Sequence, residues 1–193
     1  MINWRRGQVV VSRQRTAREG PLTEFLDSLP DRDPPLVRVP GVAVFLNPSK
    51  DTTPLALRAE VEYTNTFHER AVIVSIDQVS IPHVDDHERF TVERLGRKFK
   101  ACHVTARVGY HDEPDVPELL RLCRKDGLLE RNLDLEHASY FLSRATLQAL
   151  PTPGLSRWRK LLFITMAHNA ANPAEYFGLP ADRTVVMGNH VSF

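Results

Sequence analysis

Residues 38–65 read RVPGVAVFLNPSKDTTPLALRAEVEYTN, and this stretch decides the fold. It starts with an unbroken apolar run at 42–46, which Pro-Gly precedes and Asn-Pro follows. An apolar run without alternation is typical of a strand that is covered on both faces, as in the middle of a parallel sheet. The sequence therefore predicts a central strand with helices on both sides.

A helix is expected from about Pro54, after the polar loop 47–53. Thr52 or Thr53 is its predicted N-cap. Its predicted core face has three members at helical spacing: Leu55, Ala59 and Tyr63. A second continuous apolar run at 71–76 follows, so the pattern predicts a right-handed parallel strand-helix-strand unit.

The strands further along the chain carry a different pattern. Residues 90–92 and 102–108 alternate apolar with polar side chains on either side of Gly96, which predicts a hairpin of half-exposed strands. Further strands are expected at 138–143 and 184–188. The predicted fold class is α/β, with three layers, a largely parallel central sheet, an antiparallel hairpin extension and an N-terminal helical arm.

Two more helices are predicted after the hairpin. One carries the apolar stripe Val116, Leu119, Leu120 and Cys123, and Gly127 is its expected stop. The acidic residues before it are expected to cap it or to favour its N-terminus: Asp112, Glu113 and Asp115. The strongest helical pattern of the chain lies between 158 and 169.

The N-terminal part is expected to form a separate arm. A short helix after Gly20-Pro21 leads into PDRDPP at 30–35, where three prolines in six residues predict a linker. The predicted division is a basic juxtamembrane-type arm and linker at 1–35 and an α/β body at 36–193.

The first eighteen residues contain five arginines and no acidic residue. This composition is typical of the cytoplasmic flank of a membrane helix, so Trp4, Arg5 and Arg6 are predicted to lie near a membrane. The alternative is a basic helix that is solvated on one side.

Charge and cysteine content exclude several classes of protein. A net charge of +1 gives no case for binding a nucleic acid polymer. The two cysteines, Cys102 and Cys123, lie within apolar patterns and are expected to be reduced core residues, which favours a cytosolic setting. No apolar stretch approaches the roughly 20 residues that span a bilayer.

Few motifs point to chemistry. Polar residues follow the central strand, where open α/β sheets receive ligands, so a ligand site is predicted at Asn47, Ser49, Lys50, Thr52 and Thr53. The alternative is a plain capping loop.

A second polar cluster is the sequence HVDDH at 83–87, which has the side chains of a divalent-metal site. It follows Ile-Pro and leads into a strand, so a solvated loop is preferred and no metal site is predicted. The chain contains no G-x-S-x-G, Walker or G-x-G-x-x-G motif. We therefore expect neither an enzyme nor a cofactor.

Five blocks of the chain together resemble the C-terminal cytosolic region of the KUP/HAK/KT family of potassium uptake transporters. They are VPGVAVFL (39–46), HERAVIVSI (68–76), VGYHDEPDVPELL (108–120), ASYFLSR (138–144) and PGLSRWRKLLFITMAHNAANPAEYFGLPADRTVVMG (153–188). The segment WRRG at 4–7 is similar to the part that directly follows the last membrane helix in that family. The resemblance covers essentially the whole chain.

The resemblance implies a regulatory domain at the cytoplasmic face of the cell membrane. Full-length members take up potassium, by K+:H+ symport, and bind it in a membrane part that this chain lacks. The chain is then either an excised domain that starts at an introduced Met1, which is the preferred interpretation, or a natural fragment. Related domains look like universal stress proteins and dimerise, and some bacterial members bind cyclic di-AMP. The loop NPSKDTTP lacks the glycines of a triphosphate cradle, which argues against ATP but leaves a cyclic dinucleotide as a candidate ligand.

Three functions follow from these observations. The first is a soluble regulatory and dimerisation domain of a potassium transporter that senses a cyclic dinucleotide and has the transmembrane part and a second copy as partners. The second is a purely structural dimerisation domain without a ligand. The third, an ATP-handling enzyme, lacks its motifs.

Overall fold

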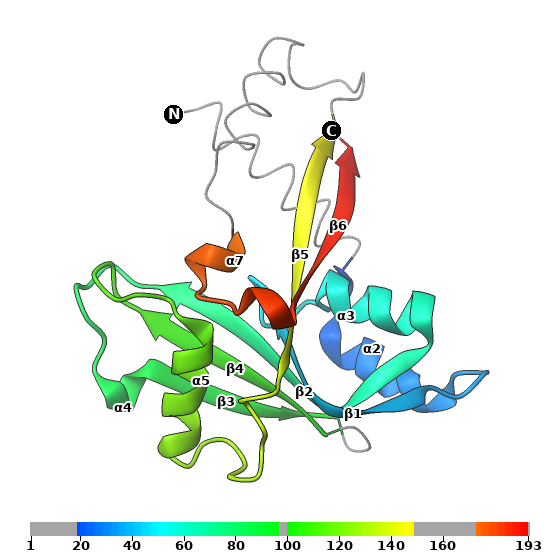
Figure 1. Ribbon diagram of the computed structural model, residues 1–193, viewed down its shortest axis with the longest axis horizontal. Helices are drawn as coiled ribbons and strands as arrows, with labels where there is room; N and C mark the ends of the chain where they lie inside the picture. The colour runs from blue at the N-terminus through cyan, green and yellow to red at the C-terminus, as the bar shows by residue number, and fades with distance from the viewer. Residues whose placement is uncertain (1–18, 97–99, 149–172, 193) are drawn as a thin grey trace.

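The computed structural model describes residues 19–96, 100–148 and 173–192 of the 193-residue chain. In this part the strands form a six-stranded sheet in the order β3-β4-β2-β1-β5-β6 (Figure 1). The strands are β1 Val37–Leu46, β2 Thr66–Gln78, β3 Phe90–Leu95, β4 Lys100–Val108, β5 Ser139–Gln148 and β6 Thr184–Ser192. β3 is antiparallel to β4 and the other pairs are parallel, which confirms the predicted α/β class with its antiparallel extension.

Helices cover both faces of β1. Successive side chains of a strand point to opposite faces, and Val44 and Phe45 accordingly belong to two different core clusters. The first cluster contains residues of α5 (Val116–Lys125), and the second contains residues of α2 (Leu22–Ser28) and α3 (Leu55–Ala59). The three-layer prediction from the apolar run is therefore confirmed.

The order of the strands creates a switch point beside β1. The chain leaves β1 through α3 to reach β2 on one side, whereas β5 pairs with β1 on the other side. Connections diverge at this point, and open α/β sheets bind ligands in the crevice outside the carboxyl ends of such strands. The loop 47–53 follows β1 directly and therefore lies at this position.

β5 and β6 extend beyond the rest of the sheet. β1 pairs with β5 only at Ser139–Leu142, whereas the pairing of β5 with β6 continues to Gln148 and Ser192. Figure 1 shows the two strands leaving the sheet as a two-stranded ribbon. The strands predicted at 138–143 and 184–188 are confirmed, and both are longer than the apolar pattern indicated because each pairs with the other.

The helix that crosses from β1 to β2 exposes a different face from the predicted one. Leu55 is buried, but Tyr63 is 84% exposed, and the buried positions towards the end of the crossover are Glu60 and Val61. The reason is that α3 continues as a π-helical segment, η2 (Glu60–Thr64), whose wider turn rotates the later residues away from the α-helical stripe. The predicted threonine cap is also wrong, since Pro54 occupies the N-cap position.

The N-terminal helix packs against the sheet. Leu22, Phe25 and Leu26 of α2 are buried in the second cluster, and Leu29 of the 3-10 turn η1 (Leu29–Asp31) joins them. The predicted boundary at residue 35 stays a prediction. The basic segment with Trp4, Arg5 and Arg6 lies outside the described residues.

The other helical segments are short. They are α4 (Asp86–Arg89), α7 (Pro173–Tyr176) and the 3-10 turn η3 (Ala181–Arg183). α5 begins as predicted, because the Asp115 carboxylate accepts a hydrogen bond of 2.8 Å from the backbone N–H of Glu118. The helical pattern at 158–169 lies outside the described residues. Within the described ranges, no helix has both the length and the apolar character that crossing a bilayer requires.

Replacing Gly109 is expected to destabilise the fold. A Cβ atom at Gly109 would clash with the Pro82 carbonyl oxygen, so Gly109→Ala should cost about 1–3 kcal/mol. The control is Gly188→Ala, whose Cβ would meet nothing within 4 Å and should shift the free energy of unfolding by less than about 0.5 kcal/mol. Urea unfolding measures both variants, and equal midpoints would contradict the close approach at Gly109.

Candidate functional site

The loop after β1 divides into buried and exposed residues. Asn47, Thr52 and Thr53 are buried, with exposed fractions of 3%, 8% and 0%. Ser49 is half-buried and Lys50 is exposed. The five predicted ligand-binding residues therefore lie in one loop at the carboxyl end of β1, but only Lys50 is fully open to solvent.

Asn47 holds the loop in shape with its side-chain amide. Its Nδ2 donates to the Ser49 carbonyl at 2.6 Å and to the Thr52 carbonyl at 2.8 Å. A carbonyl oxygen can only accept, so these contacts determine which end of the amide is nitrogen. The other end, Oδ1, is buried without a hydrogen-bond partner. It is a free acceptor beneath the loop.

Thr53 and Asp51 connect the loop to the start of α2. The backbone N–H of Thr53 donates to the Gly20 carbonyl at 2.9 Å, and its hydroxyl lies 3.3 Å from the Pro21 carbonyl. The Asp51 carbonyl in turn accepts from the backbone N–H of Leu22 at 3.0 Å. Hydrogen bonds therefore join the loop directly to the entry into α2.

A buried polar chain runs from the loop across two neighbouring strands. Ser75 of β2 donates its hydroxyl hydrogen to the Asn47 carbonyl at 2.8 Å. Its oxygen lies 3.0 Å from His103 Nε2, and because that hydrogen is already used, His103 must donate here. His103 Nδ1 is then the acceptor for the Thr105 hydroxyl at 3.4 Å. This arrangement requires a neutral imidazole.

Burial lowers the pKa of His103, which agrees with the neutral tautomer. Charges modify this effect: Glu93 raises the pKa, Lys50 lowers it and Asp51 raises it. The charged side chains Lys50 and Asp51 of the loop therefore influence the pKa of His103. Sequence analysis missed Ser75 and His103, although a polar residue inside each of two predicted strands is a signal that could have found them.

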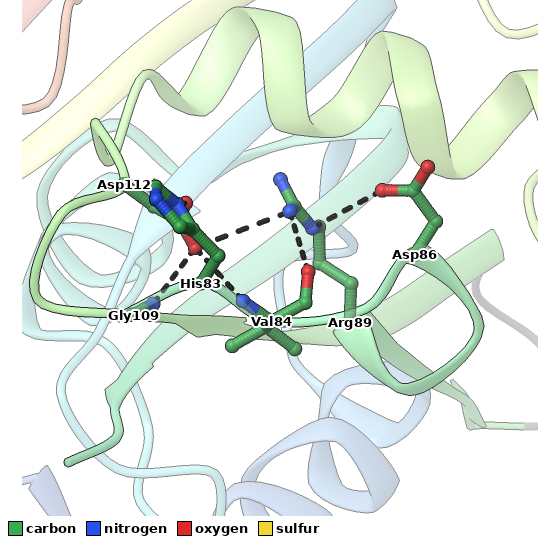
Figure 2. Close-up of polar contacts among 6 residues, drawn as sticks. All are labelled: His83, Val84, Asp86, Arg89, Gly109 and Asp112. Carbon is green, nitrogen blue, oxygen red and sulfur yellow. Dashed lines mark hydrogen bonds and ion pairs between the residues drawn. The ribbon is translucent and has the colours of Figure 1, made fainter. Parts of the chain in front are cut away.

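A second polar cluster joins two motifs that are far apart in the sequence (Figure 2). His83 Nδ1 lies 2.6 Å from Asp112 Oδ1, and Asp112 Oδ2 accepts from the backbone N–H groups of Gly109 and Val84 at 3.0 and 3.2 Å. Arg89 approaches the same oxygen at 3.9 Å. Asp112 thus connects the loops after β2 and β4. It does not cap α5, since Asp115 has that role.

The hydrogen bond from His83, followed by that from Gly109, lowers the pKa of Asp112 to about 2. Elsewhere in the HVDDH motif, Asp86 lies 3.6 Å from Arg89 Nε. Among the described residues no group of three or more His, Cys, Asp or Glu side chains could hold a metal ion. The arrangement that these residues show is a hydrogen-bonded clamp between two loops.

A cavity of about 500 Å³ lies against α5 and the segment before β6. Three arginines and three acidic residues line it: Arg89, Arg121, Arg183, Glu113, Asp115 and Glu118. Arg121 pairs with Glu118 at 3.1 Å, and Arg183 lies 3.7 Å from Asp182. Because the charges compensate each other, the cavity offers no excess charge to a ligand. No sequence motif had indicated it.

Comparison with known proteins places the chain in a family. The model of the K+ potassium transporter C-terminal domain matches residues 40–193. The chain belongs to this family. The match begins inside β1 and covers every later element of the sheet, so the matched region of this chain has the α/β fold described above.

Several curated relatives of this domain carry the name of a probable potassium transport system protein Kup. One from Rhodococcus jostii is 45% identical over 192 residues, which are 99% of this chain and 29% of that protein. Kup 2 of Sinorhizobium medicae is 36% identical over 193 residues (99% and 30%), and Kup of Methylococcus capsulatus is 35% identical over 192 residues (100% and 30%). The chain thus spans about three tenths of the length of these relatives. No solved structure matches.

The isosteric substitution Asn47→Asp tests the buried amide. A carboxylate would turn an oxygen towards the carbonyl groups of Ser49 and Thr52, so the variant should lose about 3 kcal/mol of unfolding free energy. The control Asn132→Asp makes the same change where Arg70 donates to the side-chain oxygen, and it should be neutral. Chemical denaturation measures both, and a neutral Asn47→Asp would show that the loop does not need the donor.

Asp112 should contribute a pH-dependent part of the stability. Its pKa falls from 3.8 to about 2 on folding, so its contribution is complete above about pH 4 and is lost as the pH falls through about 2. The difference in melting temperature between the wild type and Asp112→Asn should shrink over this range. A substitution of exposed Asp126 serves as control, and a difference for Asp112→Asn that does not change with pH would contradict the clamp.

Proposed function

We propose that the chain is a regulatory and dimerisation domain at the cytoplasmic face of the cell membrane, part of a transporter that takes up potassium by K+:H+ symport. The names of the relatives and their length support this proposal, because about seven tenths of each relative lies outside the match. That remainder would bind potassium and form the transmembrane partner. The arginine-rich first eighteen residues support a position next to the membrane.

The regulator would bind at the loop 47–53. The observation that carries this assignment is the buried Asn47 Oδ1, which has no hydrogen-bond partner, at the switch point of the sheet. A buried acceptor without a partner is costly, and a ligand that donates a hydrogen bond to it after the loop has opened would remove that cost. Lys50 is exposed on the same loop and offers a positive charge.

Cyclic di-AMP has the matching chemistry. Its exocyclic amines donate hydrogen bonds, and its phosphodiesters carry the negative charge that Lys50 would pair with. The loop lacks the glycines that wrap a triphosphate, which favours a cyclic dinucleotide over ATP.

A ligand bound at the loop would influence the membrane part through α2. Asp51 and Thr53 bind the residues just before and at the start of α2, and the arginine-rich segment directly precedes this point in the chain. A ligand that favours one loop conformation would therefore shift the position of the entry into α2. This is a population shift, and its size is limited by the difference in affinity of the ligand for the two conformations.

A purely structural dimerisation domain is the second candidate. The amide nitrogen of Asn47 and the hydroxyl of Thr53 already make hydrogen bonds within the protein. They are therefore not available to a ligand, which favours this candidate. In the described part of the chain β6 is an edge strand, and its Val185 and Val186 are 45% and 47% exposed, which would suit pairing with a second copy. A concentration-dependent dimer in light scattering, with no response to any nucleotide, would select this alternative.

Calorimetric titration with cyclic di-AMP tests the regulatory proposal. We expect binding and a rise in melting temperature. Lys50→Gln should weaken binding by roughly tenfold to a hundredfold, because a charge-assisted contact is lost. Lys125→Gln, at the far end of α5, is the matched control and should bind like the wild type. Absence of both heat and a melting shift at near-millimolar ligand would refute the sensing function.

A further inference from the structure

A second pocket lies at the opposite edge of the sheet from the loop 47–53. It has a volume of about 230 Å³ and lies between the turn end of the β3–β4 hairpin and the segment that follows α5. We call it the hairpin pocket. Its apolar lining is formed by Val72, Val92, Cys102, Leu129 and Leu133, among others. Because Lys100 is the first residue of β4 and pairs with Arg70 near the start of β2, the pocket lies at the amino ends of these strands.

Three basic side chains line this apolar pocket: Arg70, Arg94 and Lys100. Arg70 is already neutralised, since its Nη1 lies 2.5 Å from Glu130 and 3.0 Å from Asn132 Oδ1. The Arg94 and Lys100 side chains are exposed, and neither makes a hydrogen bond or an ion pair with another described residue. Within the described part of the chain, the solvent side of the pocket therefore carries two cations without partners.

This combination selects a particular class of ligand. Two unpaired cations attract an anion, and phosphate is a strong acceptor for arginine and lysine. An inorganic anion would leave the partly exposed lining residues Val92, Cys102 and Leu128 in contact with water, whereas a molecule with a short apolar part next to its charge would cover them. The volume is below the roughly 300–1,000 Å³ of pockets that enclose a whole drug-sized ligand, so only part of the ligand would enter.

We propose that the hairpin pocket binds the phosphate group of an anionic membrane phospholipid, with Arg94 and Lys100 on the phosphate and the apolar lining against the glycerol and the first methylene groups. A membrane lipid is favoured because the chain belongs to a transporter domain family and begins with an arginine-rich segment. The amino ends of β2 and β4 would then lie next to the lipid headgroups.

Cys102 provides a local reporter for the pocket. It lines the pocket and is half-buried, whereas Cys123, the other cysteine of the chain, is buried with 0% of its surface exposed. A ligand in the pocket should protect Cys102 from alkylation, and Cys123 reports any general unfolding. Burial raises the pKa of the Cys102 thiol to about 11, so labelling is slow enough to follow by mass spectrometry.

The test uses the full chain and lipids with chains short enough to stay monomeric in solution. Dihexanoyl phosphatidylglycerol should bind and slow the labelling of Cys102 severalfold. The double variant Arg94→Gln/Lys100→Gln should weaken this binding by about tenfold or more, because both charge-assisted contacts are lost. The control double variant Arg107→Gln/Lys125→Gln removes the same number of charges outside the pocket and should bind like the wild type.

Two further ligands test whether the pocket recognises a lipid phosphate, a free phosphate or apolar chains alone. Glycerol phosphate carries the charge without the apolar chains, and binding as tight as that of the lipid would identify a site for a free phosphate instead. Dihexanoyl phosphatidylcholine has the same chains without net charge, and equal binding would identify apolar adsorption. Either result, or lipid binding that the Arg94→Gln/Lys100→Gln variant does not weaken, overturns the proposal. None of these outcomes depends on whether cyclic di-AMP binds at the loop.

Discussion

The burial of β1 on both faces is the constraint on which the rest of the structure depends. Its alternating side chains enter two separate clusters, so each face needs its own helical cover. α5 covers one face, and α2 with α3 covers the other. Because β2 and β5 pair with its two edges, the backbone of β1 is satisfied only inside the sheet. The crossover, the N-terminal helix and the switch point all follow from this burial.

The same strand determines where the domain can respond to a ligand. In the loop after β1, the side-chain amide of Asn47 donates hydrogen bonds that shape the loop. The backbone N–H of Thr53 donates to the Gly20 carbonyl, just before α2. One loop thus serves the sheet, the start of α2 and the proposed regulator site. At the amino ends of β2 and β4, the hairpin pocket combines an apolar lining with Arg94 and Lys100, whose side chains have no partner among the described residues. The two proposed sites therefore lie at opposite ends of the strands, one for a lipid phosphate and one for a soluble regulator.

Much of the fold could be predicted because it depends on local apolar patterns. Runs such as 42–46 and 71–76 indicate buried parallel strands wherever they occur, and the structure confirms them. The face of the crossover helix could not be predicted, since the π-helical segment η2 shifts Tyr63 to the surface. Ser75 and His103 were missed for a similar reason. They meet only because β2 and β4 are neighbours in the sheet. The sequence of neither strand indicates which strand it pairs with.

The sequence by itself determined the class of fold, the family, and a loop of polar residues after the central strand, because these follow from short-range composition and from long similar blocks. Only the tertiary structure decided which of those polar groups are already used. It showed that the Asn47 amide nitrogen already donates hydrogen bonds while its oxygen accepts none, and that Asp112 joins two distant motifs. It also showed that, among the described residues, the Arg70 side chain has a partner and those of Arg94 and Lys100 do not. The physical reason is that a hydrogen bond or an ion pair depends on the distance between two groups in space, and the strand order sets that distance.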